Sequence, residues 1–139
     1  MTGIIIRPAR RADLPSLYRL ARNPKLAAPS HQAAERWWIR SFLDERQILI
    51  VAVHDDQVVG FVMGETGTGK VAIGHLLVVQ RSYQKRGLAQ RLGRAFEREC
   101  RNRGMTCVLL YASSRPMEQL LTKAGYVQGS PVREYQKFL

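Results

Sequence analysis

The sequence predicts one α/β domain, built on a central mixed, largely antiparallel β-sheet flanked by helices on both faces. Two kinds of segment alternate along its 139 residues, which are enough to build one hydrophobic core. One kind is short, apolar and rich in β-branched residues, as strands are. The other repeats its apolar residues every three or four positions, as amphipathic helices do. Because no linker or repeat separates these segments, we expect residues 1–139 to form a single domain.

The first half of the chain is expected to form three strands and two helices. Asp13 and Ser30 are typical N-cap residues, and Pro15 suits the first turn of a helix. Asn23-Pro24 ends the first helix, since proline cannot continue it. The expected elements are, in order, a strand at 4–7, a helix capped by Asp13, a helix capped by Ser30, and two strands at 48–53 and 58–63.

The second half is expected to form three strands and two helices. Gly104 and Gly125 are placed to end the helices. The segment 106–112 is largely apolar, which predicts a strand at the centre of the sheet. The expected elements are a strand at 71–79, a helix ending near Asn102, a strand at 106–112, a helix at 116–124 and a last strand at 132–138.

A short basic loop joins the expected strand 71–79 to the helix that follows it. The loop contains Lys85, Arg86 and Gly87. The N-terminus of a helix leaves backbone N–H groups without partners and carries a partial positive charge. A glycine at the turn lets a phosphate group approach those N–H groups closely. The loop therefore predicts a site for a phosphorylated ligand.

The same loop, Gln84-Lys85-Arg86-Gly87-Leu88-Ala89, resembles the Q/R-x-x-G-x-G/A motif of the GNAT N-acetyltransferase superfamily, whose members bind acetyl-CoA. Two other segments resemble that family in the same order. Val58–Val62 looks like its third strand, and Leu120–Tyr126 is similar to its L-Y-x-x-x-G-F segment. The resemblance implies a GNAT-like acetyltransferase fold. It also implies transfer of an acetyl group from acetyl-CoA to a primary amine by direct attack, without an acetyl-enzyme.

The resemblance further implies which residues hold acetyl-CoA. Backbone amides of the strand 71–79 would pair with the pantetheine arm, and those of the loop would bind the pyrophosphate. Ser114 stands where the family frequently has an asparagine after its fifth strand. No metal is expected. The expected cofactor-binding residues are Leu77, Val78, Val79, Gln84, Lys85, Arg86, Gly87, Leu88, Ala89, Gln90 and Ser114.

The residues for proton transfer depart from the family pattern. Leu121 stands where the family often has a tyrosine that protonates the leaving thiolate, and no glutamate occupies the strand 106–112. His75 is the candidate base, because imidazole exchanges protons near neutral pH. Tyr111 is the candidate acid at the end of its strand. A packing role is the alternative for both, and Glu65 is either a further candidate or a solvated residue near a turn.

A second glycine-rich segment comes within one residue of a nucleotide-binding P-loop. Gly64-Glu65-Thr66-Gly67-Thr68-Gly69-Lys70-Val71 lacks the Ser or Thr hydroxyl that would bind Mg²⁺. A P-loop must also open a helix, whereas the residues from Val71 onward are β-branched and strand-like. We therefore interpret the segment as a hairpin loop that accounts for all three glycines.

Two adjacent tryptophans, Trp37 and Trp38, mark the expected second helix. Neighbours on a helix point about 100° apart, so both cannot face the core. We expect one of them to be partly exposed, where it lines an acceptor site or covers the sheet edge. His31 lies in the same region. The expected acceptor is an amine of a small molecule or of a protein.

The chain carries a net charge of +11, and segment 81–103 holds eight Lys and Arg against two Glu. A solvated helix face and a surface that attracts polyanions both fit this pattern. Two other functions stay open: a catalytically weak acyl-CoA-binding module, and a basic nucleic-acid-binding protein. The second lacks any recognition-helix pattern or basic motif with interleaved aromatic residues, so nucleic acid is not the expected partner.

The two cysteines and the apolar pattern indicate a cytoplasmic protein. Cys100 and Cys107 are expected to be buried packing residues in a reducing compartment. No apolar run approaches the roughly 18 residues of a membrane span, and the first residues do not resemble a signal peptide. No membrane partner is expected. The family resemblance leaves open a homodimer through a sheet edge or the C-terminal strands.

Overall fold

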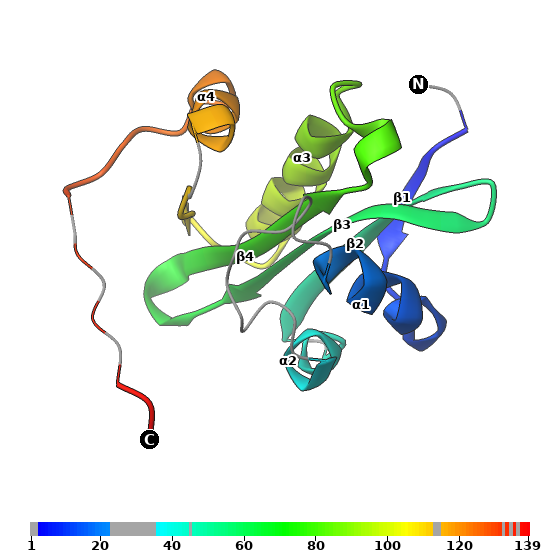
Figure 1. Ribbon diagram of the computed structural model, residues 1–139. Coiled ribbons are helices and arrows are strands. Elements are labelled where there is room, and N and C mark those ends of the chain that lie inside the picture. Colours follow the sequence, from blue (N-terminus) through cyan, green and yellow to red (C-terminus); the bar gives the residue numbers. More distant parts are fainter. Residues whose placement is uncertain are drawn as a thin grey trace.

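The computed structural model describes residues 3–22, 36–44, 46–112 and 115–131, together with 133, 135 and 137–139. Figure 1 shows a sheet between helical layers. The strands are β1 (Ile5–Pro8), β2 (Gln47–His54), β3 (Gln57–Thr66), β4 (Val71–Val79) and β5 (Cys107–Leu109). The helices are α1 (Leu14–Arg22), α2 (Arg36–Ser41), α3 (Leu88–Asn102) and α4 (Arg115–Lys123), with short 3₁₀ turns η1 (Arg11–Asp13), η3 (Thr68–Lys70) and η4 (Arg81–Tyr83).

The five strands form one mixed sheet in the order β1-β2-β3-β4-β5. The first four are antiparallel, and β5 runs parallel to β4 after the crossover through α3. The fold class predicted from the sequence is therefore confirmed. The strand at 71–79 and the helix ending at Asn102 are found at the predicted residues.

Helices cover both faces of the sheet (Figure 1), and each face has its own core. The helices α1 and α2 bury Leu17, Ile39 and their neighbours against one face. The helix α3 buries its four-residue repeat of Leu88, Leu92, Phe96 and Cys100 against the other. A buried Leu or Phe side chain contributes roughly 1.5–3 kcal/mol, so these two layers stabilise the sheet from both sides.

The strand β4 contains a bulge at His75. Met63 of β3 pairs with Leu76, but Gly64 pairs with Gly74, so His75 has no partner residue in β3. The alternation of side chains changes face at this point. Before the bulge Ala72 packs in the α3 core, whereas after it Leu76 packs in the α1 and α2 core. The bulge directs the His75 side chain to the side of α2, where it meets the rings of Trp38 and Phe42.

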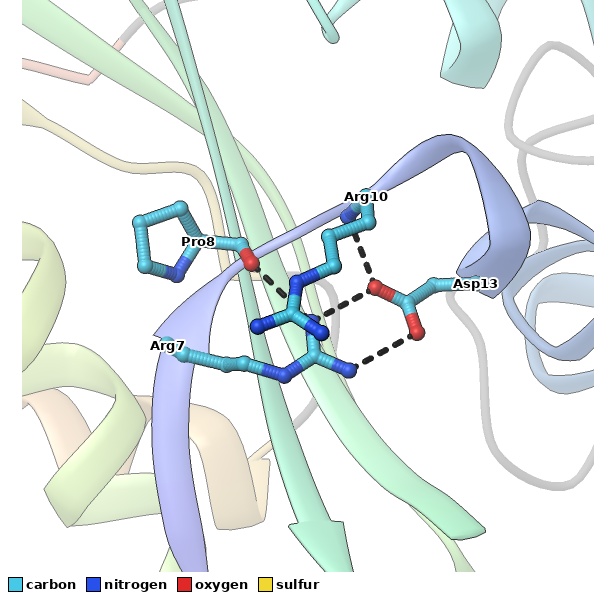
Figure 2. Close-up of polar contacts among 4 residues, drawn as sticks. All are labelled: Arg7, Pro8, Arg10 and Asp13. Atoms are coloured by element: carbon cyan, nitrogen blue, oxygen red, sulfur yellow. Dashed lines mark hydrogen bonds and ion pairs between the residues drawn. The ribbon is translucent and has the colours of Figure 1, made fainter. Parts of the chain in front are cut away.

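An ion pair joins β1 to the start of α1 (Figure 2). The two Arg7 guanidinium nitrogens donate to the two Asp13 carboxylate oxygens, at 2.8 and 3.0 Å. The backbone N–H of Arg10 also donates to Asp13, at 2.7 Å. The prediction that Asp13 caps α1 is wrong, because its bonds run back to β1 and to the turn η1 rather than forward into the helix. The predicted cap Ser30 lies outside the described residues.

The prediction that segment 106–112 forms a strand at the centre of the sheet is wrong. Only Cys107–Leu109 pair with β4, at the edge of the sheet in the described part of the chain, and Leu109 is 45% exposed. Beyond Leu109 the chain no longer pairs with β4, and the side chain of Leu110 covers Gly74. A Cβ added at Gly74 would collide with that side chain. Cys107 is exposed rather than buried as predicted, while Cys100 is buried. The predicted last strand at 132–138 is not formed by the residues described there.

The glycine-rich segment after β3 is a strand end and a turn. Val71 begins β4 rather than a helix, in agreement with the hairpin interpretation. Gly64, however, lies within β3 and not in the loop. A Cβ at Gly64 would collide with the ring of Phe96 on α3. Gly64 therefore serves close packing, so the expectation that a flexible loop accounts for all three glycines is wrong for this one.

Candidate active site

The second half of β4 offers an unpaired backbone edge. On one side β4 pairs with β3 as far as Val79, whereas β5 pairs with it only over Val71–Ile73. Among the described residues, no strand pairs with the outer edge of β4 from Gly74 to Val79. Unpaired N–H and C=O groups of such an edge can bind an extended amide-containing chain. Leu77, Val78 and Val79, predicted to hold the pantetheine arm, lie on this stretch.

The loop after β4 presents a row of free amides at the start of α3. Within the described residues, the backbone N–H groups from Lys85 to Gln90 have no hydrogen-bond acceptor, and the first helical bond runs from the Arg91 N–H to the Gly87 carbonyl. Gly87 has φ +80° and no atom within 4 Å of an added Cβ. The exposed side chains of Lys85 and Arg86 add positive charge beside it. This arrangement fits a pyrophosphate group.

Two contacts fix this loop to the sheet. The Gln84 side-chain amide donates to the Val79 carbonyl at 3.0 Å, which closes the loop onto the end of β4. The Tyr83 hydroxyl lies 2.7 Å from Nδ1 of His54, at the end of β2. The Arg86 guanidinium stacks over the Tyr83 ring, 5.7 Å from its centre. The predicted cofactor residues from Leu77 to Gln90 thus form one continuous rim, while Ser114 lies outside the described residues.

His75 lies in a cluster of aromatic and acidic side chains on the α2 side of the sheet. Its ring is 5.4 Å from that of Trp38 and 5.6 Å from that of Phe42, between centroids. Its Nε2 is 3.4 Å from the Glu65 carboxylate on β3. The His75 side chain is 26% exposed, so solvent and a substrate can reach it. The cluster combines a proton acceptor, a carboxylate to orient it and apolar walls.

The two adjacent tryptophans of α2 differ in their surroundings, as their helical spacing predicted. Trp37 is 62% exposed, whereas Trp38 packs against the core and against the His75 ring. The partly exposed tryptophan is thus Trp37, and the wall of the cluster is Trp38. His31 lies outside the described residues.

A family model described as the acetyltransferase (GNAT) family matches residues 14–126 of the chain. The chain belongs to this family. It is therefore an acyltransferase that uses acetyl-CoA and acetylates an amine. Within the described residues, no three His, Cys, Asp or Glu side chains lie close enough to bind a metal ion. No curated protein matches the chain by sequence.

Solved structures of other acetyltransferases share the fold. The ribosomal-protein-S18-alanine N-acetyltransferase from Escherichia coli is 19% identical, with a TM-score of 0.77 over 91% of this chain and 79% of that one. The aminoglycoside acetyltransferase AAC(6')-Iy, bound to a CoA bisubstrate analogue, is 18% identical, with a TM-score of 0.83 over 99% and 100%. Ard1 from Thermoplasma volcanium is 23% identical, with a TM-score of 0.77 over 93% and 86%.

The second predicted catalytic residue of this GNAT acetyltransferase, Tyr111, lies two residues beyond β5. Its side chain is 76% exposed, so it does not pack against a helix. Leu121, at the position of the family's frequent tyrosine, is in α4, and its carbonyl accepts the N–H of Tyr126 at 2.9 Å. Burial raises the pKa of Tyr126 to about 12, with the nearby Glu97 adding to the shift. A phenol with so high a pKa is a poor proton donor near neutral pH.

Two features of the site have no signal in the sequence. The first is the bulge that aims His75, because β4 is apolar on both faces and shows no alternation to be interrupted. The second is the contact of His54 with Tyr83, which joins residues 29 positions apart. Glu65 is only an alternative candidate in the sequence, and the register of β3 and β4 places it beside His75.

Cys100 has no part in this chemistry. Its thiol is buried beneath α3, and burial raises its pKa to about 11. A thiol with so high a pKa is almost wholly protonated near neutral pH and is a weak nucleophile. This agrees with direct transfer to the amine.

Proposed function

We propose that this enzyme acetylates a primary amine that enters from the α2 side, with His75 as general base and Glu65 as its orienting carboxylate. The observation that carries the proposal is the bulge, which places His75 beside Glu65 and under the rings of α2, on the strand whose free edge suits the pantetheine arm. Acetyl-CoA supplies the activated acetyl group, and the surrounding side chains move the protons.

The Glu65 carboxylate favours the tautomer in which His75 Nε2 carries a proton. The Nδ1 atom is then free to accept a proton from the attacking ammonium group, so that the nitrogen lone pair can form the new C–N bond. A backbone N–H of β4 near Leu77 polarises the thioester carbonyl. As the C–S bond breaks, Tyr111 donates a proton to the leaving thiolate. The acylated nitrogen releases its second proton to solvent, and solvent reprotonates Tyr111. A thiolate is also stable enough to leave unprotonated, so Tyr111 is less critical than His75.

A substitution at His75 tests this assignment. His75→Gln keeps the size of the side chain and removes the base. Its kcat should fall by about 10²–10³-fold near neutral pH, since general bases contribute roughly that much. The affinity for CoA should stay unchanged. At high pH, where the free amine needs no base, the variant should approach the wild type. A pH–rate profile that keeps the shape of the wild type would contradict the role of His75.

The same measurements separate this function from the two alternatives. A panel of amines, including N-terminal peptides, lysine peptides and aminoglycosides, is followed by release of CoA thiol. A catalytically weak CoA-binding module would bind acetyl-CoA and turn over none of them. A nucleic-acid-binding protein would bind single or double strands with an affinity that falls steeply with salt. The acceptor that gives the highest kcat/KM identifies the substrate class.

Location and assembly are part of the same proposal. Cys100 and Cys107 carry free thiols, which suits a reducing cytoplasm. In the described part of the chain, no helix has the length and hydropathy to span a membrane. A homodimer through the exposed edge of β1, or through the segment after α4, is compatible with the fold. Light scattering at several protein concentrations measures the oligomeric state.

A further inference from the structure

A groove of about 640 Å³ lies beside α3, on the side of β1 and β2. Ile6, Ile48 and Ile50 of these strands form its apolar lining, and Arg91, Arg94 and Arg98 of α3 form its basic wall. No residue of the rim from Leu77 to Gln90 lines it. Its volume is within the roughly 300–1,000 Å³ typical of small-molecule sites. The groove is therefore separate from the cofactor rim, and it shares Phe42 with the cluster around His75.

The basic wall follows from the helical spacing of α3. Positions 91, 94 and 98 recur every three or four residues, so they share one flank of the helix. At 1.5 Å per residue, they extend over about 10 Å of the groove. The i, i+4 row on the opposite flank, Ala89, Gly93, Glu97 and Arg101, carries one arginine and one glutamate, so it has no net charge.

The charge of this wall is not neutralised by the acids of the groove. Its two carboxylates, Asp44 and Glu99, already have arginine partners, Arg46 at 3.2 Å and Arg103 at 2.9 Å. The ion pairs of the described residues leave Arg94 and Arg98 without a carboxylate. Both side chains reach the surface and can turn toward a ligand.

The lining of the groove includes a buried hydrogen-bond acceptor. Gln47 begins β2 and lines the groove, and its Oε1 atom is buried without a hydrogen-bond donor among the described residues. Most buried polar atoms in folded proteins have a partner. A ligand with an N–H or O–H group could supply one here. The groove thus offers cationic groups for phosphate, an acceptor for a donor group and apolar side chains between them.

We propose that this groove binds a phosphate-bearing small molecule of about nucleotide size, at a site distinct from the cofactor loop. Guanidinium groups match phosphate oxygens in a bidentate geometry, which favours phosphate over other anions of similar charge. The apolar strand residues suit the face of a base, and the Gln47 acceptor suits its amino group. The proposal does not depend on which amine the enzyme acetylates.

ADP is the probe, titrated by calorimetry at low ionic strength. Because ADP is also part of CoA, the titration uses the Gly87→Asp variant, in which the cofactor loop repels phosphate. We expect one ADP per chain. Adding Arg94→Gln and Arg98→Gln should weaken binding by about tenfold or more, as expected for lost charged hydrogen bonds. The control is also made in the Gly87→Asp variant and removes the same charge from α1, by Arg19→Gln and Arg22→Gln. This control should bind ADP as before.

Three results would overturn the proposal. Binding of ADP to the wild type but not to Gly87→Asp would assign all binding to the cofactor loop. An unchanged affinity after the Arg94 and Arg98 substitutions would exclude the basic wall. An equal loss in the α1 control would show a general effect of net charge. Thermal unfolding of each variant confirms that the chain is folded, so a loss of binding refers to the groove.

Discussion

The Tyr83 hydroxyl and His54 Nδ1 lie 2.7 Å apart and join the cofactor loop to the far end of β2. The two rings also meet edge to face, with centroids 5.5 Å apart. Asp55 extends the contact, with its carboxylate 3.7 Å from His54 Nε2. Since Arg86 also stacks on the Tyr83 ring, the position of Arg86, a predicted cofactor-binding residue, depends on this bond.

Removing the hydroxyl in Tyr83→Phe should loosen the loop. A hydrogen bond of this kind contributes about 0.5–1.5 kcal/mol, so the dissociation constant for CoA should rise by about two- to tenfold. The KM for acetyl-CoA should rise while kcat stays the same, because the reacting groups are untouched. Tyr18→Phe on α1 is the matched control and should change neither. A fall in kcat alone would mean that Tyr83 acts in the chemistry.

The charge of the cofactor loop is tested at Gly87. Asn and Asp tolerate a positive φ better than other side chains, so both can replace Gly87 at φ +80° with similar strain. Gly87→Asp should abolish CoA binding, since it adds a carboxylate beside the pyrophosphate. Gly87→Asn should weaken it much less. Equal affinities for the two variants, measured by calorimetry, would show that the pyrophosphate does not lie at this turn.

The Arg7–Asp13 pair predicts how stability depends on pH. The Arg7 guanidinium, helped by the Arg10 N–H, lowers the pKa of the Asp13 carboxyl. The resulting stabilisation is complete above the pKa of an unfolded aspartate, about 3.9, and is lost as the pH falls through the lower pKa of the folded state. Asp13→Asn should therefore lose about 1–3 kcal/mol of unfolding free energy at pH 7. At pH 2 to 3 the loss should shrink.

Urea denaturation at both pH values measures these differences. Asp44→Asn is the control, because Asp44 pairs with Arg46 on the open surface and should contribute little. If Asp13→Asn were as stable as the wild type at pH 7, the pair would not secure β1 to α1.

Thiol labelling distinguishes the two cysteines. Cys107 is exposed, whereas Cys100 is buried with a pKa raised to about 11. At pH 8, iodoacetamide should modify Cys107 and leave Cys100 intact until the chain is denatured. Mass spectrometry of peptides gives the extent at each site. Acetyl-CoA alone should acetylate neither thiol, and a stable acetyl adduct on either one would contradict direct transfer.

The sequence indicates the sheet, the cofactor loop and α3 because each has a local signal. Gly87 needs a positive φ that few residues adopt, and the spacing of Leu88, Leu92 and Phe96 defines a buried helix face. The edge position of β5 has no such signal. An apolar segment can pair as a central strand or fold over a glycine, as Leu110 does at Gly74, and only the rest of the fold decides between them.

For the catalytic candidates, too, the sequence gives the local position but not the neighbours in space. His75 can be placed on its strand from sequence, but its neighbours Trp38 and Glu65 come from α2 and β3, and their distances follow from tertiary packing. Tyr111 lies past the end of its strand, so alternation along the strand does not set its direction. Ser114 lies in a part of the chain that the structure does not describe.

The bulge at His75 divides β4 into two halves in which the side chains alternate between the two faces in opposite order. In the first half the even-numbered residues face α3, and in the second half the odd-numbered ones do. Without residue 75, Gly74 and Leu76 would be adjacent, opposite Gly64 and Met63, and the strand would be regular with every other side chain on its present face. The sheet itself therefore does not require the extra residue. Residue 75 adds one side chain to the α2 face without changing the packing of either core.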